Sequence, residues 1–408
     1  MTGENLNRIL KIAYQTEYYK QIYNAKKINV SNVRFEELPF VTQRDLIENW
    51  ELFRNNKQEI FRVSASSGTT KHPKVVHRTV KDFETSSKVM ESMLRAINIT
   101  NKDVVYIGQP FDLASFGYLV LEGCKKIGAL ALPGGLGQSD EKMLEIIQWG
   151  KASVIMTSPS RIKELMKILL IEENKILRQE IIRNVKKIVV AGEPCRKSDR
   201  NQIESFWSCE VYDFYGSEET DSLGYSDNDE YITLMKDYFY FEFLELPHTS
   251  KFELVITSLY LEGTPLIRYK LGDIVEKNEF GQIKIIGKTF DVLYLYDGVK
   301  LYAFQIEDAI STVIKHDFSF QIVCDYIDSM DCLTILIDYK ENEMYSNEEI
   351  NTKIVEAIWN SSLDFEVYKI LNKLKVTVKL NSGEIHITRR GKIPKIVDNR
   401  KEKNVQFS

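Results

Sequence analysis

The most informative stretch of the sequence is one polar loop, Ser66-Ser67-Gly68-Thr69-Thr70-Lys71-His72-Pro73-Lys74, which follows an expected strand at residues 60–64. Gly68 lets a backbone come close to a ligand, and the neighbouring amides and hydroxyls can donate hydrogen bonds to phosphate oxygens. Lys74 adds a positive charge that suits a polyphosphate. The loop is not the Gly-Lys-Ser/Thr loop of the common nucleoside triphosphatases, because its lysine follows a proline. A Ser/Gly/Thr run can equally form a plain flexible turn, so its meaning depends on the sequence around it.

Downstream of this loop, short apolar runs alternate with segments of helical spacing. We expect strands at residues 104–107, 129–132, 153–156, 187–190 and 210–214. This alternation predicts an α/β layer with a largely parallel sheet. Ligands of such sheets bind beyond the carboxyl ends of the strands. The chemistry is therefore expected in the segments that follow the strands, at residues 109–112, 157–159, 191–194 and 215–219.

The remaining patterns complete the expected domain organisation. Upstream, residues 6–23 predict one amphipathic helix, and Thr42 is a candidate helix N-cap. From about residue 231 the chain is β-rich, with strands expected at 238–244, 252–258, 266–269 and 283–286, and a smaller unit follows with strands at 320–326, 332–338 and 375–380 and helices at 305–315 and 347–360. We expect a large N-terminal α/β domain with a mostly parallel sheet and a β-rich subdomain (1–287), followed by a small, mobile α+β C-terminal domain (288–408).

The composition argues against several classes of protein. The 408 residues include 43% hydrophobic and 28% charged side chains, which is typical of a soluble globular protein. The net charge of -5, with basic residues scattered along the chain, gives no footprint for nucleic acid. No run is long enough to predict a membrane-spanning helix, and we expect no signal peptide at the start. The five widely spaced cysteines predict reduced thiols in the cytoplasm and no structural zinc site.

Six islands of sequence, taken in order, resemble the adenylate-forming superfamily of acyl-CoA ligases and adenylation domains, and above all its phenylacetate-CoA ligase-like branch. They lie at residues 66–74, 191–194, 212–219, 265–273, 287–298 and 391–398, and read SSGTTKHPK, AGEP, YDFYGSEE, PLIRYKLGD, GKTFDVLYLYDG and GKIPKIVD. Each island is short on its own. Six of them in the family's order span nearly the whole chain.

The resemblance implies a role for each matching residue. Lys392 would stabilise charge as a carboxylate attacks the α-phosphate of ATP, and Glu219 would hold magnesium. Tyr215 would stack on the adenine. The remaining nucleotide-binding positions are Ser66, Ser67, Gly68, Thr69, Thr70 and Lys74 for the phosphates, Glu193, Pro194, Asp213, Gly216 and Ser217 for the adenine pocket, and Asp273 and Lys288 for the ribose.

Two acidic residues leave one assignment open. A strict alignment places Glu218 where the family has a serine or threonine that contacts the α-phosphate, with Glu219 as the magnesium ligand. A shift of one residue makes Ser217 that hydroxyl and Glu218 the ligand. The chain also departs from the family pattern where Lys71 and His72 enter the phosphate loop, and Lys288 replaces an arginine.

The acid substrate is expected beside residues 111–116, 132–137 and 193–194. Candidate contacts are Phe111, Asp112, Phe116, Gly134 and Gly135. The aromatic side chains favour an aryl acid or a small acid with an apolar tail, and Asp112 could meet an amino or hydroxyl group.

The resemblance thus implies an ATP- and magnesium-dependent ligase that forms an acyl-adenylate, releases pyrophosphate and transfers the acyl group to a thiol. Coenzyme A is the expected acceptor, and no zinc is expected. Two alternatives stay open: an enzyme that loads the phosphopantetheine arm of an acyl carrier protein, and a degenerate nucleotide-binding protein without turnover. The branch also suggests a homodimer.

Overall fold

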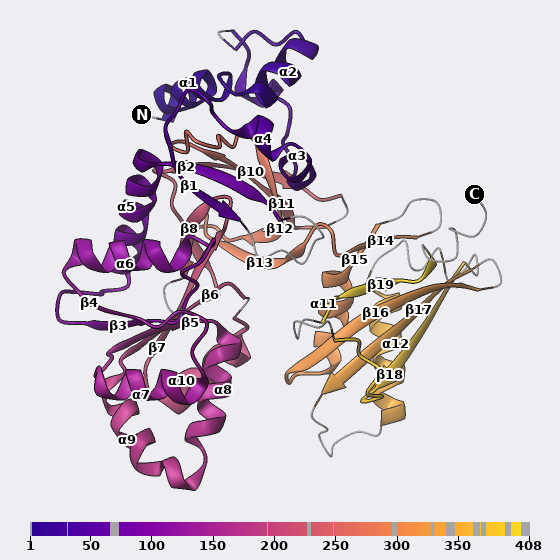
Figure 1. Cartoon of the computed structure of the whole chain (residues 1–408). Helices are drawn as coiled ribbons and strands as arrows, with labels where there is room; N and C mark the ends of the chain where they lie inside the picture. Colours follow the sequence, from indigo (N-terminus) through magenta and orange to yellow (C-terminus); the bar gives the residue numbers. More distant parts are fainter. Residues whose placement is uncertain are drawn as a thin grey trace. The chain divides into compact units, whose positions relative to one another are not determined.

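The computed structural model describes residues 2–30, 32–65, 73–193, 195–226, 230–247, 249–295, 300–327, 330–339, 347–361, 368, 373–387 and 393–400. The chain divides into two compact units, a first unit at Met1–Ile285 and a second unit at Ile286–Ser408 (Figure 1). Within the described residues, no helix is both long and apolar enough to cross a membrane.

The N-terminal segment forms two helices, α1 (Thr2–Ala13) and α2 (Glu17–Ala25), so the expectation of one helix over residues 6–23 is wrong. The helix is interrupted because Thr16 forms the N-cap of a second helix. Thr16 adopts an extended backbone, and its hydroxyl accepts a hydrogen bond from the Tyr19 amide at the start of α2. The predicted N-cap at Thr42 is confirmed, because its side chain and that of Asp45 form a reciprocal capping box on α3 (Gln43–Glu48).

Over the described residues the main sheet has eleven strands, in the order β10-β11-β12-β13-β9-β8-β7-β6-β5-β3-β4. Its parallel part confirms the predicted alternation. The parallel strands are β3 (Val104–Ile107), β4 (Leu130–Pro133), β5 (Val154–Thr157), β6 (Lys187–Ala191) and β7 (Glu210–Ser217). The helices between and around them are α5 (Val80–Ala96), α6 (Phe116–Ile127), α7 (Asp140–Trp149), α8 (Pro159–Leu169), η2 (Glu172–Asn174), α9 (Lys175–Asn184) and α10 (Lys197–Trp207).

Side-chain alternation along these strands creates three layers. Val105, Val154 and Val189 pack with residues of α5 and α6, whereas Tyr106 and Ile155, on the opposite face, pack with residues of α7, α8 and α10. Figure 1 shows the same division, with α5 and α6 on one side of the parallel strands and α7 to α10 on the other. Both faces of these strands are buried, as is usual for parallel sheets.

Beyond β7 the sheet continues with antiparallel pairing, which accommodates the predicted β-rich segment. Its strands are β8 (Asp221–Ser226), β9 (Ile232–Leu234), β10 (Phe239–Glu245), β11 (Phe252–Ser258), β12 (Tyr269–Lys277) and β13 (Ile283–Lys288), and a separate hairpin pairs β1 (Ile60–Ala65) with β2 (Val75–Thr79). The strand expected at residues 266–269 is wrong, because Arg268 has a φ of 48°, outside the extended region, and β12 begins only at Tyr269.

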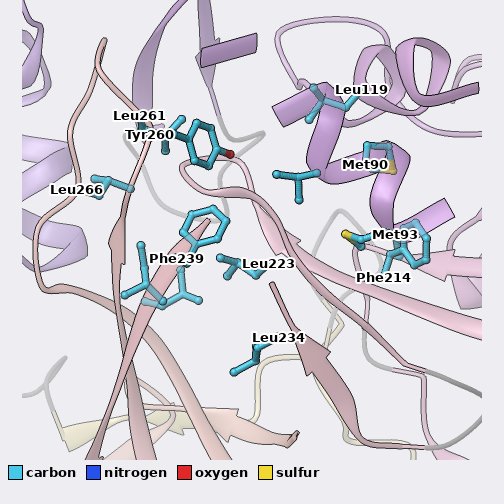
Figure 2. Close-up of a cluster of buried hydrophobic side chains, with 14 of the residues drawn as sticks. Met90, Met93, Leu119, Phe214, Leu223, Leu234, Phe239, Tyr260, Leu261 and Leu266 are labelled. Atoms are coloured by element: carbon cyan, nitrogen blue, oxygen red, sulfur yellow. The ribbon is translucent and has the colours of Figure 1, made fainter. Parts of the chain in front are cut away.

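One buried cluster joins the parallel and antiparallel parts. Figure 2 shows Met90, Met93 and Leu119 from α5 and α6 together with side chains from β7 to β10 and the loop before β12. Smaller elements of this unit are η1 (Phe35–Glu37) and α4 (Trp50–Phe53). A continuous core of this kind fixes the strand ends that carry the polar side chains described below.

The second unit is an α+β layer. In its described part, a four-stranded sheet has the order β18-β17-β16-β19. Ile306, Ile310 and Ile354 of its helices share one buried cluster with Phe320 and Ile335 of the sheet. The elements are β14 (Val292–Tyr294), β15 (Lys300–Tyr302), α11 (Ala303–Val313), β16 (Phe318–Ile327), β17 (Met330–Tyr339), α12 (Asn347–Trp359), β18 (Leu374–Leu380) and β19 (Ile396–Asp398).

Candidate active site

The loops that follow the parallel strands meet at one edge of the main sheet. The Ser115 amide, after β3, donates a hydrogen bond of 2.9 Å to a Glu218 carboxylate oxygen after β7. The Ser160 hydroxyl, after β5, donates one of 2.9 Å to a Glu193 carboxylate oxygen after β6. Parallel strands place their carboxyl ends on the same edge, so these contacts follow from the topology.

An ion pair connects the end of the phosphate-loop region with the turn after β7. Lys74 Nζ lies 2.6 Å from Glu219 Oε1, and the Tyr269 hydroxyl donates to the same oxygen at 2.8 Å. The Glu219 side chain is 1% exposed, and within the described part of the chain its Oε2 has no hydrogen-bond partner. Burial alone would raise the pKa of Glu219, but the Lys74 charge and the hydrogen bonds hold it below its ordinary value. The carboxylate is therefore ionised at neutral pH.

A second pair lies beside the first. The Tyr215 hydroxyl donates a hydrogen bond of 2.7 Å to Asp273 Oδ2, and Asp273 is 2% exposed. Burial and the Asp273 charge raise the pKa of Tyr215 well above its ordinary value, so its hydroxyl stays a donor. At Gly216 a Cβ would overlap the main-chain carbonyl oxygen of Asp221. Only glycine fits next to Tyr215 in this backbone.

Sequence reasoning missed a buried arginine that supports the turn after β7. Arg78, in β2, is 1% exposed; it donates to the main-chain oxygens of Glu218 (3.2 Å) and Glu219 (2.9 Å), and its Nε lies 3.2 Å from Asp221 Oδ2. The hydroxyls of Ser86 and Ser115 also donate to the Asp221 carboxylate, at 2.7 and 2.8 Å. The only signal in the sequence was a charged residue inside the apolar run 75–79.

The pKa values of two further carboxyl groups, those of Glu218 and Asp213, are raised. Burial raises the pKa of Glu218 to about 7, assisted by the nearby Asp221 charge. Burial likewise raises the pKa of Asp213 to about 7, against the opposing effect of Arg200. The Ser217 hydroxyl lies 2.9 Å from that of Thr220. Asp213 and Ser217 belong to β7 and Glu218 follows it directly, and the assignment between Ser217 and Glu218 stays open.

The predicted acid-binding residues also come together in part. The amides of Gly134 and Gly135 both donate to the Ile107 oxygen at 3.0 Å, and a Cβ on Gly135 would meet the Phe111 ring. Asp112 Oδ1 accepts from the Ala114 amide at 2.9 Å, so it supports its own turn. Phe116 opens α6 and is partly buried against the main core.

Some predicted residues are not placed by these contacts. Ser66, Ser67, Gly68, Thr69, Thr70, Pro194 and Lys392 lie outside the described residues. Lys288 ends β13 within the second unit; burial raises the pKa of the nearby Asp291, and the charges of Lys395 and Lys288 oppose this rise. Across the described side chains, no group of three or more His, Cys, Asp and Glu residues could hold a metal ion.

No family model matches the chain. The chain is 28% identical over 358 residues to a phenylacetate-coenzyme A ligase of Aromatoleum evansii, covering 82% of this chain and 80% of the relative. It is 24% identical to the phenylacetate-coenzyme A ligase of Escherichia coli, covering 87% and 85%. A crystal structure of 2-hydroxyisobutyryl-CoA ligase superposes with a TM-score of 0.70 at 18% identity, covering 99% of this chain and 91% of that one. In sequence the chain is thus similar to phenylacetate-coenzyme A ligases, and it shares its fold with 2-hydroxyisobutyryl-CoA ligase.

Proposed function

We propose that this protein is an ATP-dependent acid–thiol ligase. In the first step an oxygen of the acid's carboxylate attacks the α-phosphorus of ATP, so that acyl-AMP forms and pyrophosphate leaves. In the second step the coenzyme A thiol attacks the acyl carbon, its proton goes to solvent, and AMP leaves. The relatives named as phenylacetate-coenzyme A ligases support both the reaction and the acceptor.

The observation that carries the proposal is that two buried carboxylates, Glu219 and Asp273, each have a close partner at the carboxyl edge of the sheet. The Tyr215–Asp273 hydrogen bond joins β7 to β12, and Glu219, in the turn after β7, is bound by Lys74 and by Tyr269 of β12. Tyr215 offers an aromatic face for adenine, and the Asp273 carboxylate can accept both ribose hydroxyls. Lys74 offers a cation for the phosphates.

Glu219 is the residue that we propose for magnesium. Its buried Oε2, which has no hydrogen-bond partner in the part of the chain described, fits a hard cation that prefers oxygen ligands. When bound there with a nucleotide, magnesium would neutralise phosphate charge. Lys74 and Tyr269 hold the other carboxylate oxygen and so fix the orientation of the group.

The remaining residue roles rest on the matching motifs. Lys392 is proposed to stabilise the charge that develops at the α-phosphate, and Ser66, Ser67, Gly68, Thr69 and Thr70 to hold the leaving phosphates. In-line attack depends on positioning and charge neutralisation, which these residue types can supply. The five cysteines, none in a disulfide, fit a reducing compartment such as the cytoplasm.

Acid-dependent exchange of labelled pyrophosphate into ATP tests the first step. The panel should include phenylacetic acid, 2-hydroxyisobutyric acid, benzoic acids and short-chain acids. We expect exchange with at least one acid, and a loss of about a hundredfold or more in Lys392→Ala. Lys353→Ala, on α12, is the matched control and should exchange normally. Absence of exchange with every acid, despite measurable ATP binding, would reject the proposal in favour of nucleotide binding without turnover.

The second step is tested with the acid that supports exchange. Coenzyme A should be converted to the acyl thioester with release of AMP. If the acyl group were transferred only to a phosphopantetheine-loaded carrier protein, the adenylation step of the proposal would stand and the carrier protein would take the place of coenzyme A as the acceptor.

A further inference from the structure

Glu218 stands between the nucleotide turn and the loop expected to hold the acid. Its Oε1 accepts a hydrogen bond of 2.9 Å from the amide of Ser115, the residue that precedes α6. Phe111 and Asp112 lie earlier in that same loop, and Phe116 follows Ser115 directly. The carboxylate therefore faces the acid side of the site through a direct contact.

Glu218 lies near one negative and one positive side chain, Asp221 and Arg78. In the described chain its carboxylate takes part in no ion pair, and the neighbouring Asp221 is also acidic. Arg78 directs its donors at the Glu218 and Glu219 main-chain oxygens and at the Asp221 carboxylate. An ionised carboxylate has about four acceptor sites, so this group has capacity for a donor brought by a ligand.

Glu218 is also poorly suited to contact a phosphate. In its ionised form, which is the form that accepts a hydrogen bond from a ligand, the carboxylate has no proton to donate and would be repelled by a phosphate at about 4 Å even in a partly solvated site. Its neighbour Glu219 carries the ion pair with Lys74, and consecutive Cα atoms are about 3.8 Å apart. Because we propose Glu219 for magnesium beside the phosphates, we expect a substrate group that reaches Glu218 to belong to the end of the acid that reacts.

We propose that Glu218 selects acids that carry an amino or hydroxyl group next to the carboxyl group, by accepting a hydrogen bond from that group. The inference rests on the proposed function, since it assigns a part of the same site. It narrows the substrate class from aryl or small acids to those with a hydrogen-bond donor near the reacting carboxylate. The Ser115 amide would hold the Glu218 side chain in place for this contact.

The test compares acids that differ only by the donor. The pairs are phenylacetic acid with 2-phenylglycine and mandelic acid, propionic acid with alanine and lactic acid, and benzoic acid with 2-aminobenzoic and 2-hydroxybenzoic acids. For the wild type we expect kcat/KM in pyrophosphate exchange to be about tenfold or more higher for the donor-bearing members of at least one set, because hydrogen bonds to charged groups are strong.

Glu218→Gln should reduce this preference about tenfold, mainly through KM for the donor-bearing acids, and should lower kcat/KM less for the plain acids than for the donor-bearing ones. Glu122→Gln, an exposed substitution on α6, is the matched control and should leave the preference intact. ATP affinity measured by calorimetry should be the same in both variants, which shows that the nucleotide site is folded. Calorimetric binding of each acid pair to the wild type tests the preference without any variant.

Three outcomes overturn the inference. Equal use of plain and donor-bearing acids by the wild type would show that no donor is recognised. Equal losses for all acids in Glu218→Gln, with a raised magnesium requirement, would assign Glu218 to the metal and phosphates. Absence of exchange with every acid would reject the proposed function itself, which the first two outcomes leave standing.

Discussion

The Lys74 ammonium and the Glu219 carboxylate meet at 2.6 Å although 145 residues separate them in the chain. Lys74 directly precedes β2, and Glu219 lies in the turn between β7 and β8. The ion pair therefore joins the segment after the polar loop to the turn that follows Tyr215. Glu219 is almost fully buried. Removal of Lys74 would therefore leave a buried negative charge without a neighbouring positive charge.

A double-mutant cycle on this pair should measure a strong coupling. Lys74→Met, Glu219→Gln and the double variant are compared by urea unfolding, and we expect a coupling energy of about 1–3 kcal/mol, since the pair is shielded from solvent. The exposed pair Arg44–Glu48 on α3 is the control, with an expected coupling below about 0.5 kcal/mol. Equal coupling in the two cycles would contradict the buried ion pair.

Arg78 should be a major contributor to stability. Replacement by methionine leaves Asp221 buried beside Glu218 without its cation, so we expect a loss of about 3 kcal/mol or more in the free energy of unfolding. Lysine should restore only part of this, because it cannot reach two carbonyl oxygens and a carboxylate with a rigid fork. Arg95→Met, at an exposed pair on α5, should cost less than about 0.5 kcal/mol. Urea unfolding that ranks Arg78→Met with Arg95→Met would disprove this role.

Gly216 should not tolerate a side chain. A Cβ there overlaps the Asp221 carbonyl oxygen, so Gly216→Ala must shift the backbone of the turn. We expect a loss of about 1–3 kcal/mol in stability and weaker ATP binding, since Tyr215 is displaced with it. Gly137→Ala is the control, because a Cβ at that position would have no other atom within 4 Å. The measurements are urea unfolding and calorimetry with ATP, and unchanged values for Gly216→Ala would contradict the geometry.

The pH dependence of stability should report the buried Glu218 carboxyl. Its pKa is raised from 4.5 to about 7, so between these values the folded protein holds a proton that the unfolded chain has lost. Stability is thus favoured below pH 4.5 and declines as the pH rises to about 7. The contribution is on the order of 2 kcal/mol, given about 1.4 kcal/mol per pKa unit and partial solvent access.

Glu218→Gln removes this titration. The variant should gain stability relative to the wild type as the pH rises from about 5 to about 8, measured as the difference in unfolding free energy at each pH. Asp213→Asn should show the same sign, because burial also raises the pKa of Asp213 to about 7. A constant difference across the pH range would show that neither carboxyl holds a proton in this window.

The local pattern of apolar and polar residues was sufficient to predict much of the fold. The strands at β3, β5, β6 and β7 begin at or within one residue of their predicted starts, because each is a short segment rich in apolar side chains between polar loops. Parallel pairing followed from the alternation with helices. The pattern failed where one residue changes the backbone: Thr16 starts a new helix inside an unbroken apolar periodicity, and Arg268 adopts a positive φ inside an apolar run.

The site was harder to predict, because its contacts are distant in sequence. The resemblance to the adenylate-forming superfamily singled out Lys74, Glu219, Tyr215 and Asp273, and the structure places these four together. Nothing local marks Arg78 as their support, since its partner Glu218 lies 140 residues away. The roles of these residues stay predictions until they are measured.

The fate of the acid's carboxylate oxygen tests the central claim most directly. An acid that supports pyrophosphate exchange is labelled with ¹⁸O in its carboxyl group and converted to its thioester with ATP and coenzyme A. Attack on the α-phosphorus predicts that AMP is released carrying one ¹⁸O atom, together with unlabelled pyrophosphate. Release of ADP with label in inorganic phosphate would place the attack on the γ-phosphorus and contradict the adenylate mechanism.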